Sequence, residues 1–299
     1  MLDRTIWWHV YPLAALGAPI RDKHDSAHRL RALEPWLDYL VELGCNGLLL
    51  GPIFASATHG YDTLDHFRID PRLGDEEDFA WLIDECSARG IHIMLDGVFN
   101  HVARTHPWVA DGLAGDTDWE GHGELATLHH ADPAVRDAVV EIMLHWLRRG
   151  IAGWRLDVAY AVPADFWADV LARVRSEFPD AMFLGEVIHG DYASIGKAGS
   201  LDAVTQYELW KATWSSLVDV NFWELAHALE VIAYNPSQRG FFGRRQLAEE
   251  FMELGFGMFV WTVDEPAVWE RLLGSGVSGI ITNHPGRLQG YLAAKYDAV

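Results

Sequence analysis

The stretch GWRLDVAY, residues 153–160, decides the fold and points to one face of it. Trp154 and Leu156 alternate with Arg155 and Asp157, and a period of two residues is typical of a β-strand. An arginine and an aspartate on one face of an otherwise apolar strand need polar surroundings. The pattern therefore predicts a strand with one face in a hydrophobic core and the other at a polar site.

Seven further runs have the same strand-like, apolar character. They are TIWWHVYP (5–12), CNGLLLGP (45–52), IHIMLDGV (91–98), AMFLGEVI (181–188), LDAVTQYEL (201–209), GMFVWTVD (257–264) and SGIITN (278–283). Amphipathic helical segments lie between many of them, and several end in glycine, a common helix stop. Eight strands that alternate with helices predict a single α/β domain over residues 1–299, a closed (β/α)8 barrel.

The spacing of the strands is uneven in two places. Residues 102–130, rich in Gly, His and Asp, separate the third strand from the fourth and predict a short inserted loop or subdomain over one end of the barrel. A second long gap, between the sixth and seventh strands, contains VIAYN (231–235). Either this segment is not a strand, or the count of eight is wrong there.

Composition restricts the partners that the chain can bind. Half of the 299 residues are hydrophobic, which suits one barrel of roughly 250 residues or more, and the formal net charge is -20. Such a chain repels nucleic acid and anionic lipid, so we expect neither as a partner. Cys45 and Cys86 lie in apolar or helical stretches, so we expect buried free thiols. Charges near the N-terminus and the lack of a long apolar run predict a cytoplasmic protein; the oligomeric state is not predicted.

Polar residues follow the strands of the predicted barrel, at the ends where barrels build their active sites. They come from six strands: Tyr61, Asp62, Asp96, Asn100, His101, Arg155, Asp157, Glu186, Asp264, Glu265, Asn283 and His284. Taken singly, each has a structural explanation. For Asp96, a structural role at a turn and a catalytic role explain the position equally well. For His101 taken alone, a structural role is favoured.

Asp157 and Glu186 differ from the others because they follow neighbouring strands, about 4.8 Å apart. Two carboxylates about 5–5.5 Å apart are the geometry of a retaining glycosidase, in which one attacks the anomeric carbon and the other protonates the leaving oxygen. Arg155 points the same way as Asp157, and its charge would keep that nucleophile ionised. Glu186 follows an apolar Phe-Leu-Gly, which favours the protonated form of an acid.

Five segments closely resemble the α-amylase family of glycoside hydrolases. They are IWWHVYP, GYDTLDHFRIDPRLG, DGVFNH, GWRLDVAY and FLGEVIHG, in the family's order and spacing, and the resemblance runs from about residue 5 to about residue 229. It implies a (β/α)8 barrel with a subdomain after strand three.

By position, the resemblance makes Asp157 the nucleophile and Glu186 the acid/base. It also implies that Arg155 and His101 hold the sugar at the cleaved bond, that Tyr61 stacks on that sugar and that Asp62 supports the site. Asn100 matches a calcium ligand of many members. Because members with a short insert often lack that ion, we predict no metal or other cofactor.

After about residue 229 the resemblance changes. The family's Asn-His-Asp motif at strand seven, whose aspartate stabilises the transition state, is not found, and residues 230–299 resemble instead the last third of a glycerophosphodiester phosphodiesterase. The sequence thus predicts a hybrid barrel, engineered rather than natural, with six βα units in residues 1–229 and two in 230–299. Asp264 stands near the lost aspartate and either replaces it or caps the helix that follows.

Three functions follow from these observations. The first is a retaining α-glycoside hydrolase that acts on an α-glucoside or oligosaccharide, with activity impaired by the lost motif. The second is a catalytically inert chimeric barrel scaffold. The third, a phosphodiesterase, is disfavoured because the metal-binding acids of that family are missing from the chain.

Overall fold

The computed structural model describes residues 5–21, 25–115, 119–219, 225, 233–234, 241–242, 249 and 257–296. The chain forms two compact units, here called unit 1 (Met1–Gln206) and unit 2 (Tyr207–Val299). Within the described residues, every helix is too short or too polar to cross a membrane. The expected join near residue 229 lies outside the described residues.

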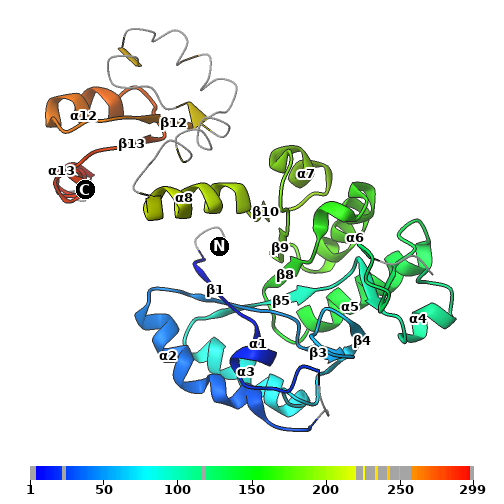
Figure 1. Ribbon diagram of the computed structural model, residues 1–299. Helices are drawn as coiled ribbons and strands as arrows, with labels where there is room; N and C mark the ends of the chain where they lie inside the picture. Colours follow the sequence, from blue (N-terminus) through cyan, green and yellow to red (C-terminus); the bar gives the residue numbers. More distant parts are fainter. Residues whose placement is uncertain are drawn as a thin grey trace. The chain divides into compact units, whose positions relative to one another are not determined.

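A six-stranded parallel sheet is the centre of unit 1 (Figure 1). Its order follows the order of these strands along the chain, as it does in consecutive βα units of a barrel. The strands are β1 (Trp7–Val10), β2 (Gly47–Leu50), β5 (His92–Gly97), β8 (Gly153–Leu156), β9 (Met182–Gly185) and β10 (Ala203–Val204). The neighbours β5, β8 and β9 carry most of the candidate site.

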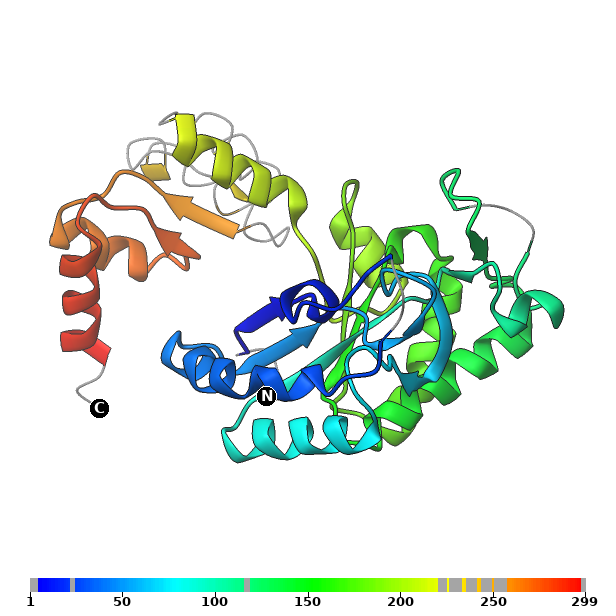
Figure 2. The ribbon, with the colours of Figure 1, turned by 60° about the horizontal axis from the view of Figure 1, so that its bottom comes forward.

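Helices connect these strands and lie along the outer side of the sheet (Figure 2). The longer ones are α2 (Glu34–Glu42), α3 (Glu76–Ala88), α5 (Pro133–Leu147) and α6 (Ala164–Glu177). Asp75 begins α3 with a capping box, and Asp132 caps α5 just before Pro133, so both helices start where their sequences favour a start. The described residues include both cysteines, Cys45 and Cys86, and both are free thiols.

Shorter elements cover the ends of the strands. Two antiparallel hairpins are added, β3 with β4 and β6 with β7. The second hairpin and α4 belong to the predicted insert 102–130. The bounds of these elements are α1 (Pro12–Ala15), η2 (Arg29–Leu33), β3 (Phe54–Ser56), β4 (Thr63–Ile69), β6 (His101–Ala103), α4 (Pro107–Ala110), β7 (Leu125–Thr127), η3 (Ala159–Ala161) and α7 (Tyr192–Ala198).

Unit 2 contains a parallel ladder of three short strands. The strands are β11 (Ala233–Tyr234), β12 (Gly257–Val260) and β13 (Gly279–Ile280), and the helices are α8 (Tyr207–Asp219), α12 (Pro266–Leu273) and α13 (Pro285–Tyr296). Its core includes buried Phe241, Met258, Val260 and Trp269. Unit 2 therefore has a hydrophobic cluster of its own.

All eight predicted strands are present, although most are shorter than predicted. The segment 231–235 contributes a ninth, β11, which pairs with β12, so the count of eight is wrong. The stretch 201–209 is shortened most, to β10 (Ala203–Val204), and in the stretch 153–160 β8 ends at Leu156, shortly before the backbone turns at Val158.

Candidate active site

Arg155 is the centre of the candidate site. Asp96 on β5 lies directly opposite it in the strand register. One guanidinium nitrogen, Nη1, donates to both oxygens of Asp96, at 2.8 and 2.9 Å, and to Oδ1 of Asp157, at 2.7 Å. The other, Nη2, lies 2.5 Å from Oε1 of Glu186. One guanidinium therefore holds three carboxylates.

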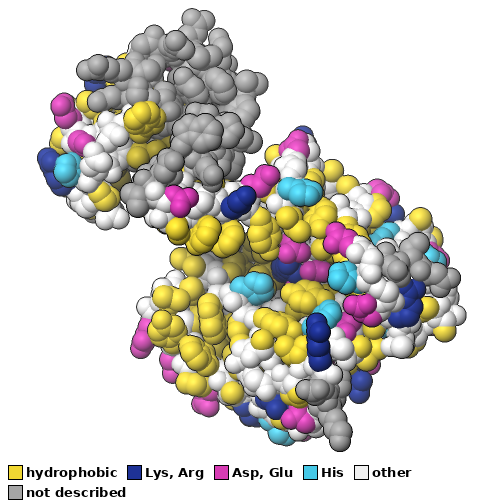
Figure 3. All heavy atoms as spheres, viewed as in Figure 1, with side chains coloured by type: hydrophobic (Ala, Val, Ile, Leu, Met, Phe, Trp, Pro, Cys, Tyr) yellow, Lys and Arg dark blue, Asp and Glu magenta, His cyan; other side chains and the backbone are white. Residues whose placement is uncertain are grey.

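Asp157 and Glu186 lie together because β8 and β9 end side by side. The Asp157 amide donates to Gly97 O at the end of β5, and the Glu186 amide donates to Leu156 O at the end of β8. Both carboxylates bind the same guanidinium, so they are neighbours in space, and acidic, basic and histidine side chains gather on the face of unit 1 seen in Figure 3. The sequence places these two side chains at neighbouring strand ends, and their catalytic roles stay a prediction.

The backbone between the two carboxylates is unusual. Val158 has φ 41° and ψ 44°, a left-handed conformation that is costly for a β-branched residue. In this conformation its amide donates to Oε2 of Glu186 at 3.0 Å. The strained residue thus helps to fix Glu186, as strained residues at functional sites often do.

A hollow of about 230 Å³ opens in front of Asp157. Tyr61, His101 and Trp119 line it, and Trp119 stacks on His101 with ring centroids 6.0 Å apart. His101 Nδ1 accepts from Asn100 Nδ2, so Nε2 carries the hydrogen that it donates to Tyr61 O at 3.1 Å. The hollow therefore combines aromatic surface and polar groups, which suits a sugar ring.

Tyr61 and Asp62 belong to a tight loop before β4. Tyr61 Oη donates to Asp96 Oδ2 at 3.2 Å, and burial raises the pKa of Tyr61 far above its usual range. Asp62 is buried and accepts from the Thr58 hydroxyl at 2.6 Å and from the Gly60 amide at 3.2 Å. Its contacts shape the loop that carries Tyr61.

Burial dominates the protonation of the site. It raises the pKa of Asp157 to about 8, with the charge of Asp96 adding to the effect and Arg155 opposing it. Burial also raises the pKa of Asp96 to about 6, again against the opposing charge of Arg155. Arg155 acts in the expected direction and lowers the pKa of Asp157, while burial and the charge of Asp96 act against it.

The described residues offer one group of three ligands suited to a metal, and it lies away from the carboxylates. His28, Asp75 and Asp78 have ligand atoms within 4.8 Å of one another. However, Asp78 is already paired with His28 at 2.5 Å and with Arg31 at 2.6 Å. Asn100 donates its side-chain amide to Nδ1 of the neighbouring His101, and the expectation that no calcium binds there stays a prediction.

Asp264 belongs to unit 2, where it joins the ends of β12 and β13. Its oxygens accept from the Thr282 hydroxyl and from the backbone and side-chain nitrogens of Asn283, each at 2.9 Å. These hydrogen bonds, the Asn283 amide first, lower the pKa of Asp264. Helix α12 has Glu265 as its N-cap residue, so the cap role considered for Asp264 is wrong.

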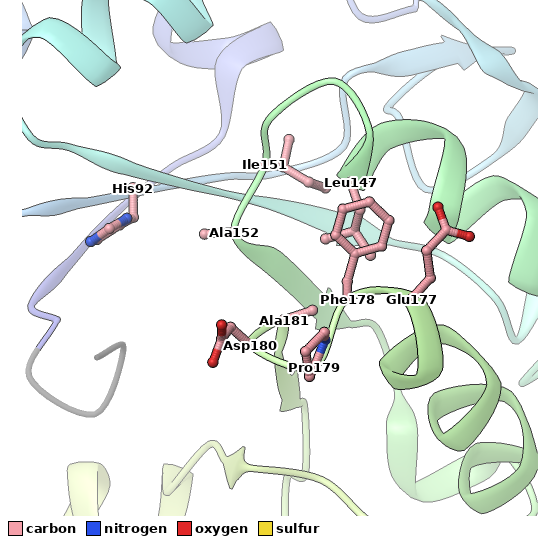
Figure 4. A pocket seen from close by; sticks show the side chains of 9 residues that line it. All are labelled: His92, Leu147, Ile151, Ala152, Glu177, Phe178, Pro179, Asp180 and Ala181. Carbon is pink, nitrogen blue, oxygen red and sulfur yellow. The ribbon is translucent and has the colours of Figure 1, made fainter.

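A second hollow, of about 350 Å³, lies near the N-terminal ends of β5, β8 and β9 (Figure 4). Its lining is mostly apolar, with His92, Glu177 and Asp180 at its edges. The three carboxylates follow the opposite ends of the same strands. This hollow is therefore separate from the candidate active site.

The sequence reasoning left several neighbours of the site unassigned. The sequence pattern explains Asp96 equally well as a turn residue or as a functional group, although its place opposite Arg155 follows from strand register. Arg72 and Asp70, which form a buried ion pair under the loop of Tyr61, stand in the quoted segment GYDTLDHFRIDPRLG and could have been noticed. Trp119 lies in the insert, where no pattern pointed to it.

Comparison with known proteins identifies the class to which this fold and site belong. The protein-family model for the α-amylase catalytic domain matches residues 25–121 and 119–236 of the sequence. The chain therefore belongs to the α-amylase family. A glycerophosphoryl diester phosphodiesterase family model matches the short stretch 257–286.

Individual relatives are α-glucan hydrolases by name. The intracellular maltogenic amylase of Bacillus subtilis is 39% identical over 223 residues, which is 62% of this chain and 38% of the relative. The cyclomaltodextrinase of Geobacillus thermopakistaniensis is 34% identical over 246 residues, 69% of this chain and 42% of the relative. The chain thus spans about two fifths of the length of these relatives.

Solved structures support the same fold. The Nostoc punctiforme debranching enzyme is 27% identical, with a TM-score of 0.59 over 71% of this chain and 55% of that one. The cyclic α-maltosyl-(1→6)-maltose hydrolase of Arthrobacter globiformis is 22% identical, with a TM-score of 0.68 over 94% and 73%. The latter shows the likeness of the fold alone.

Proposed function

We propose that this chain is a retaining hydrolase of α-glucosidic bonds, with maltodextrin-like oligosaccharides as substrates. The observation that carries the proposal is the meeting of Asp157 and Glu186 on the guanidinium of Arg155. Two carboxyl groups at adjacent strand ends, beside a hollow with aromatic walls, match the needs of a double displacement. The names of the relatives, maltogenic amylase and cyclomaltodextrinase, support the substrate class.

In this mechanism Asp157 attacks the anomeric carbon while Glu186 gives its proton to the departing glycosidic oxygen. A covalent glycosyl-enzyme forms, and Glu186 then takes a proton from the water that cleaves it. Before substrate binds, Arg155 holds both carboxylates in place. Tyr61 and His101, which line the hollow beside Asp157, contact the sugar ring.

Impaired activity is part of the proposal. The Asn-His-Asp motif, whose aspartate would stabilise the cationic transition state, is not found in the sequence after strand six. Losing one preorganised charge costs several kcal/mol of transition-state stabilisation, on the order of 3 kcal/mol or more. That Asp264 supplies the missing charge stays a separate hypothesis, since Asp264 binds Thr282 and Asn283 within unit 2.

The origin and location of the protein are also proposals. The short phosphodiesterase match over residues 257–286 supports a second family as the source of the last units, and we propose that an engineered join produced this hybrid barrel. The name of the intracellular Bacillus subtilis relative supports a cytoplasmic location. The net charge of -20 disfavours nucleic acid and anionic membranes as partners.

The test uses nitrophenyl α-maltoside and three forms of the protein. We expect the wild type to release nitrophenol and Asp157→Asn to release none above background. Asp137→Asn, which changes an exposed carboxylate on α5, should match the wild type and controls for the substitution itself. If wild type and Asp157→Asn both release nitrophenol only at the background rate, the inert scaffold is favoured and the proposal of an active hydrolase is refuted.

Two further variants separate the roles within the site. Glu186→Gln should lose more activity on maltotriose than on the nitrophenyl glycoside, because nitrophenol leaves without a proton. Asp264→Asn should lower any residual rate at least tenfold if it supplies the missing charge; an unchanged rate would refute that role. Release of the α-anomer, followed by NMR, should accompany retention.

A further inference from the structure

The three carboxylates around Arg155 cannot all be ionised without leaving an excess of negative charge in a buried place. Asp96, Asp157 and Glu186 carry three negative charges when ionised, and Arg155 carries one positive charge. The side chains of Asp96 and Arg155 are 0% and 7% exposed, and those of Asp157 and Glu186 are 8% and 12% exposed. Such a cluster keeps a proton, as carboxylates that share one site commonly do.

The hydrogen bonds indicate which carboxylate keeps it. Asp96 accepts from Arg155 with both oxygens and also from Tyr61 Oη. Glu186 accepts from Val158 N with one oxygen and pairs with Arg155 through the other. The donors to Asp96 favour its ionised form, and each oxygen of Glu186 also has a donor.

Asp157 has the weakest set of donors. In the described part of the chain, its Oδ1 accepts from Arg155 at 2.7 Å, and no donor reaches its Oδ2. Asp157 also faces the hollow, so a hydrogen on Oδ2 has room. The raised pKa of Asp157, about 8 through burial and the charge of Asp96, agrees with this geometry.

We infer that in the resting protein the proton needed for catalysis resides on Asp157, and that it moves to Glu186 when the sugar binds. The step rests on the proposed function and is balanced. The O–H bond of Asp157 breaks, an O–H bond forms on Glu186, and the total charge of the three carboxylates and Arg155 is unchanged. The products of the step are an ionised nucleophile and a protonated acid, as the reaction requires.

The same step changes the partners of Arg155. A protonated Glu186 attracts the guanidinium less, whereas a newly ionised Asp157 attracts it more. In the proposal Glu186 then turns toward the glycosidic oxygen and leaves Arg155, while Arg155 stays with Asp96 and Asp157. The ion pair of Arg155 with Glu186 is therefore a resting contact that substrate binding opens.

Other charged and titratable groups lie around Asp157 besides Arg155 and the two carboxylates. Burial lowers the pKa of His101 to about 4, so this neighbour is neutral. His9 on β1 interacts electrostatically with both Arg155 and Glu186, and burial lowers its pKa as well. The remaining groups along the hollow are Tyr61, His59, His122 and Glu124.

The experiment is infrared difference spectroscopy of the resting protein, because the carbonyl band of a protonated carboxyl lies apart from those of carboxylates. We compare the wild type with Asp157→Asn, Glu186→Gln and Asp96→Asn, after circular dichroism has shown that each is folded. At pH 7 we expect the wild type to show a protonated carboxyl that Asp157→Asn lacks. Glu186→Gln should keep it at pH 6, and in Asp96→Asn the band should titrate at lower pH.

Loss of the band in Glu186→Gln with retention in Asp157→Asn would place the proton on Glu186 and overturn the inference. Loss in Asp96→Asn alone would place it on Asp96, with the same consequence. A wild type without the band at pH 7 would also refute it. The measurement needs no turnover, so failure of the hydrolysis assay and failure of this inference are distinguishable.

Discussion

Replacement of Arg72 by methionine should strongly destabilise unit 1. Arg72 and Asp70 are 0% and 1% exposed, and the guanidinium donates to both carboxylate oxygens, at 2.8 and 2.6 Å. Removing one partner of a buried pair leaves an uncompensated charge and costs about 3–5 kcal/mol. The guanidinium also donates to Thr58 O at 2.6 Å and to Ser56 Oγ at 2.8 Å, and these acceptors lose their donor.

The assay is urea unfolding at 25 °C, followed by tryptophan fluorescence. The control is Arg68→Met, because Arg68 is 61% exposed and lies 3.8 Å from Asp65 in a surface pair that contributes at most about 1 kcal/mol. The double variant Arg72→Met with Asp70→Asn should recover part of the loss, since the unpaired charge is gone. Arg72→Met with a loss no greater than that of Arg68→Met would refute the reasoning.

The pH dependence of the same pair gives a second check. Burial alone would raise the pKa of Asp70, but the hydrogen bonds from Arg72 hold it below its ordinary value. The pair therefore stabilises the fold fully above the ordinary pKa of an aspartate, and the stabilisation is lost as the pH falls below it. The difference between wild type and Arg72→Met should shrink below about pH 4.

Three further outcomes concern single positions. Burial lowers the pKa of His66 to about 3 and that of His106 to about 4. Below pH 6.5 the unfolded chain therefore binds more protons than the folded chain, and the stability advantage of wild type over His66→Asn, measured by urea titration, should fall by about 1.4 kcal/mol per pH unit down to about pH 4. A difference that stays constant with pH would contradict this. Val158→Gly should leave the free energy of unfolding within about 1 kcal/mol of wild type, since glycine relieves the left-handed backbone; a loss above about 2 kcal/mol would argue against strain there. Gly153→Ala should lower that free energy by about 1–3 kcal/mol, because the added carbon would lie 2.0 Å from Met182 O; an unchanged value would show that β8 and β9 can separate.

Much of the arrangement of β8 followed from its sequence. Trp154 is buried while Arg155 and Asp157 share the site, as the alternation predicts. The meeting of Asp157 with Glu186 followed from the rule that neighbouring parallel strands end at one edge. Local pattern and strand order are therefore sufficient to bring the two carboxylates together.

Other features depend on contacts that no local pattern encodes. The raised pKa of Asp157 comes from burial and from Asp96, a residue 61 positions away in the chain, rather than from its neighbour Arg155. Val158 continues the alternation in the sequence, yet its backbone is left-handed and its amide binds Glu186. Asp264 precedes a helix, yet it bonds to Asn283 instead of capping it.

The guanidinium shared by three acids has a consequence for protein engineering. Arg155 uses two nitrogens to bind the three carboxylates, whereas a lysine has only one. Even the conservative substitution Arg155→Lys would therefore leave one carboxylate without its counter-ion. Each of the four positions also sets the charge that the remaining three can tolerate. Attempts to redesign this site for a new reaction will have to change the four residues together, since stepwise replacement passes through sequences with an unbalanced buried charge.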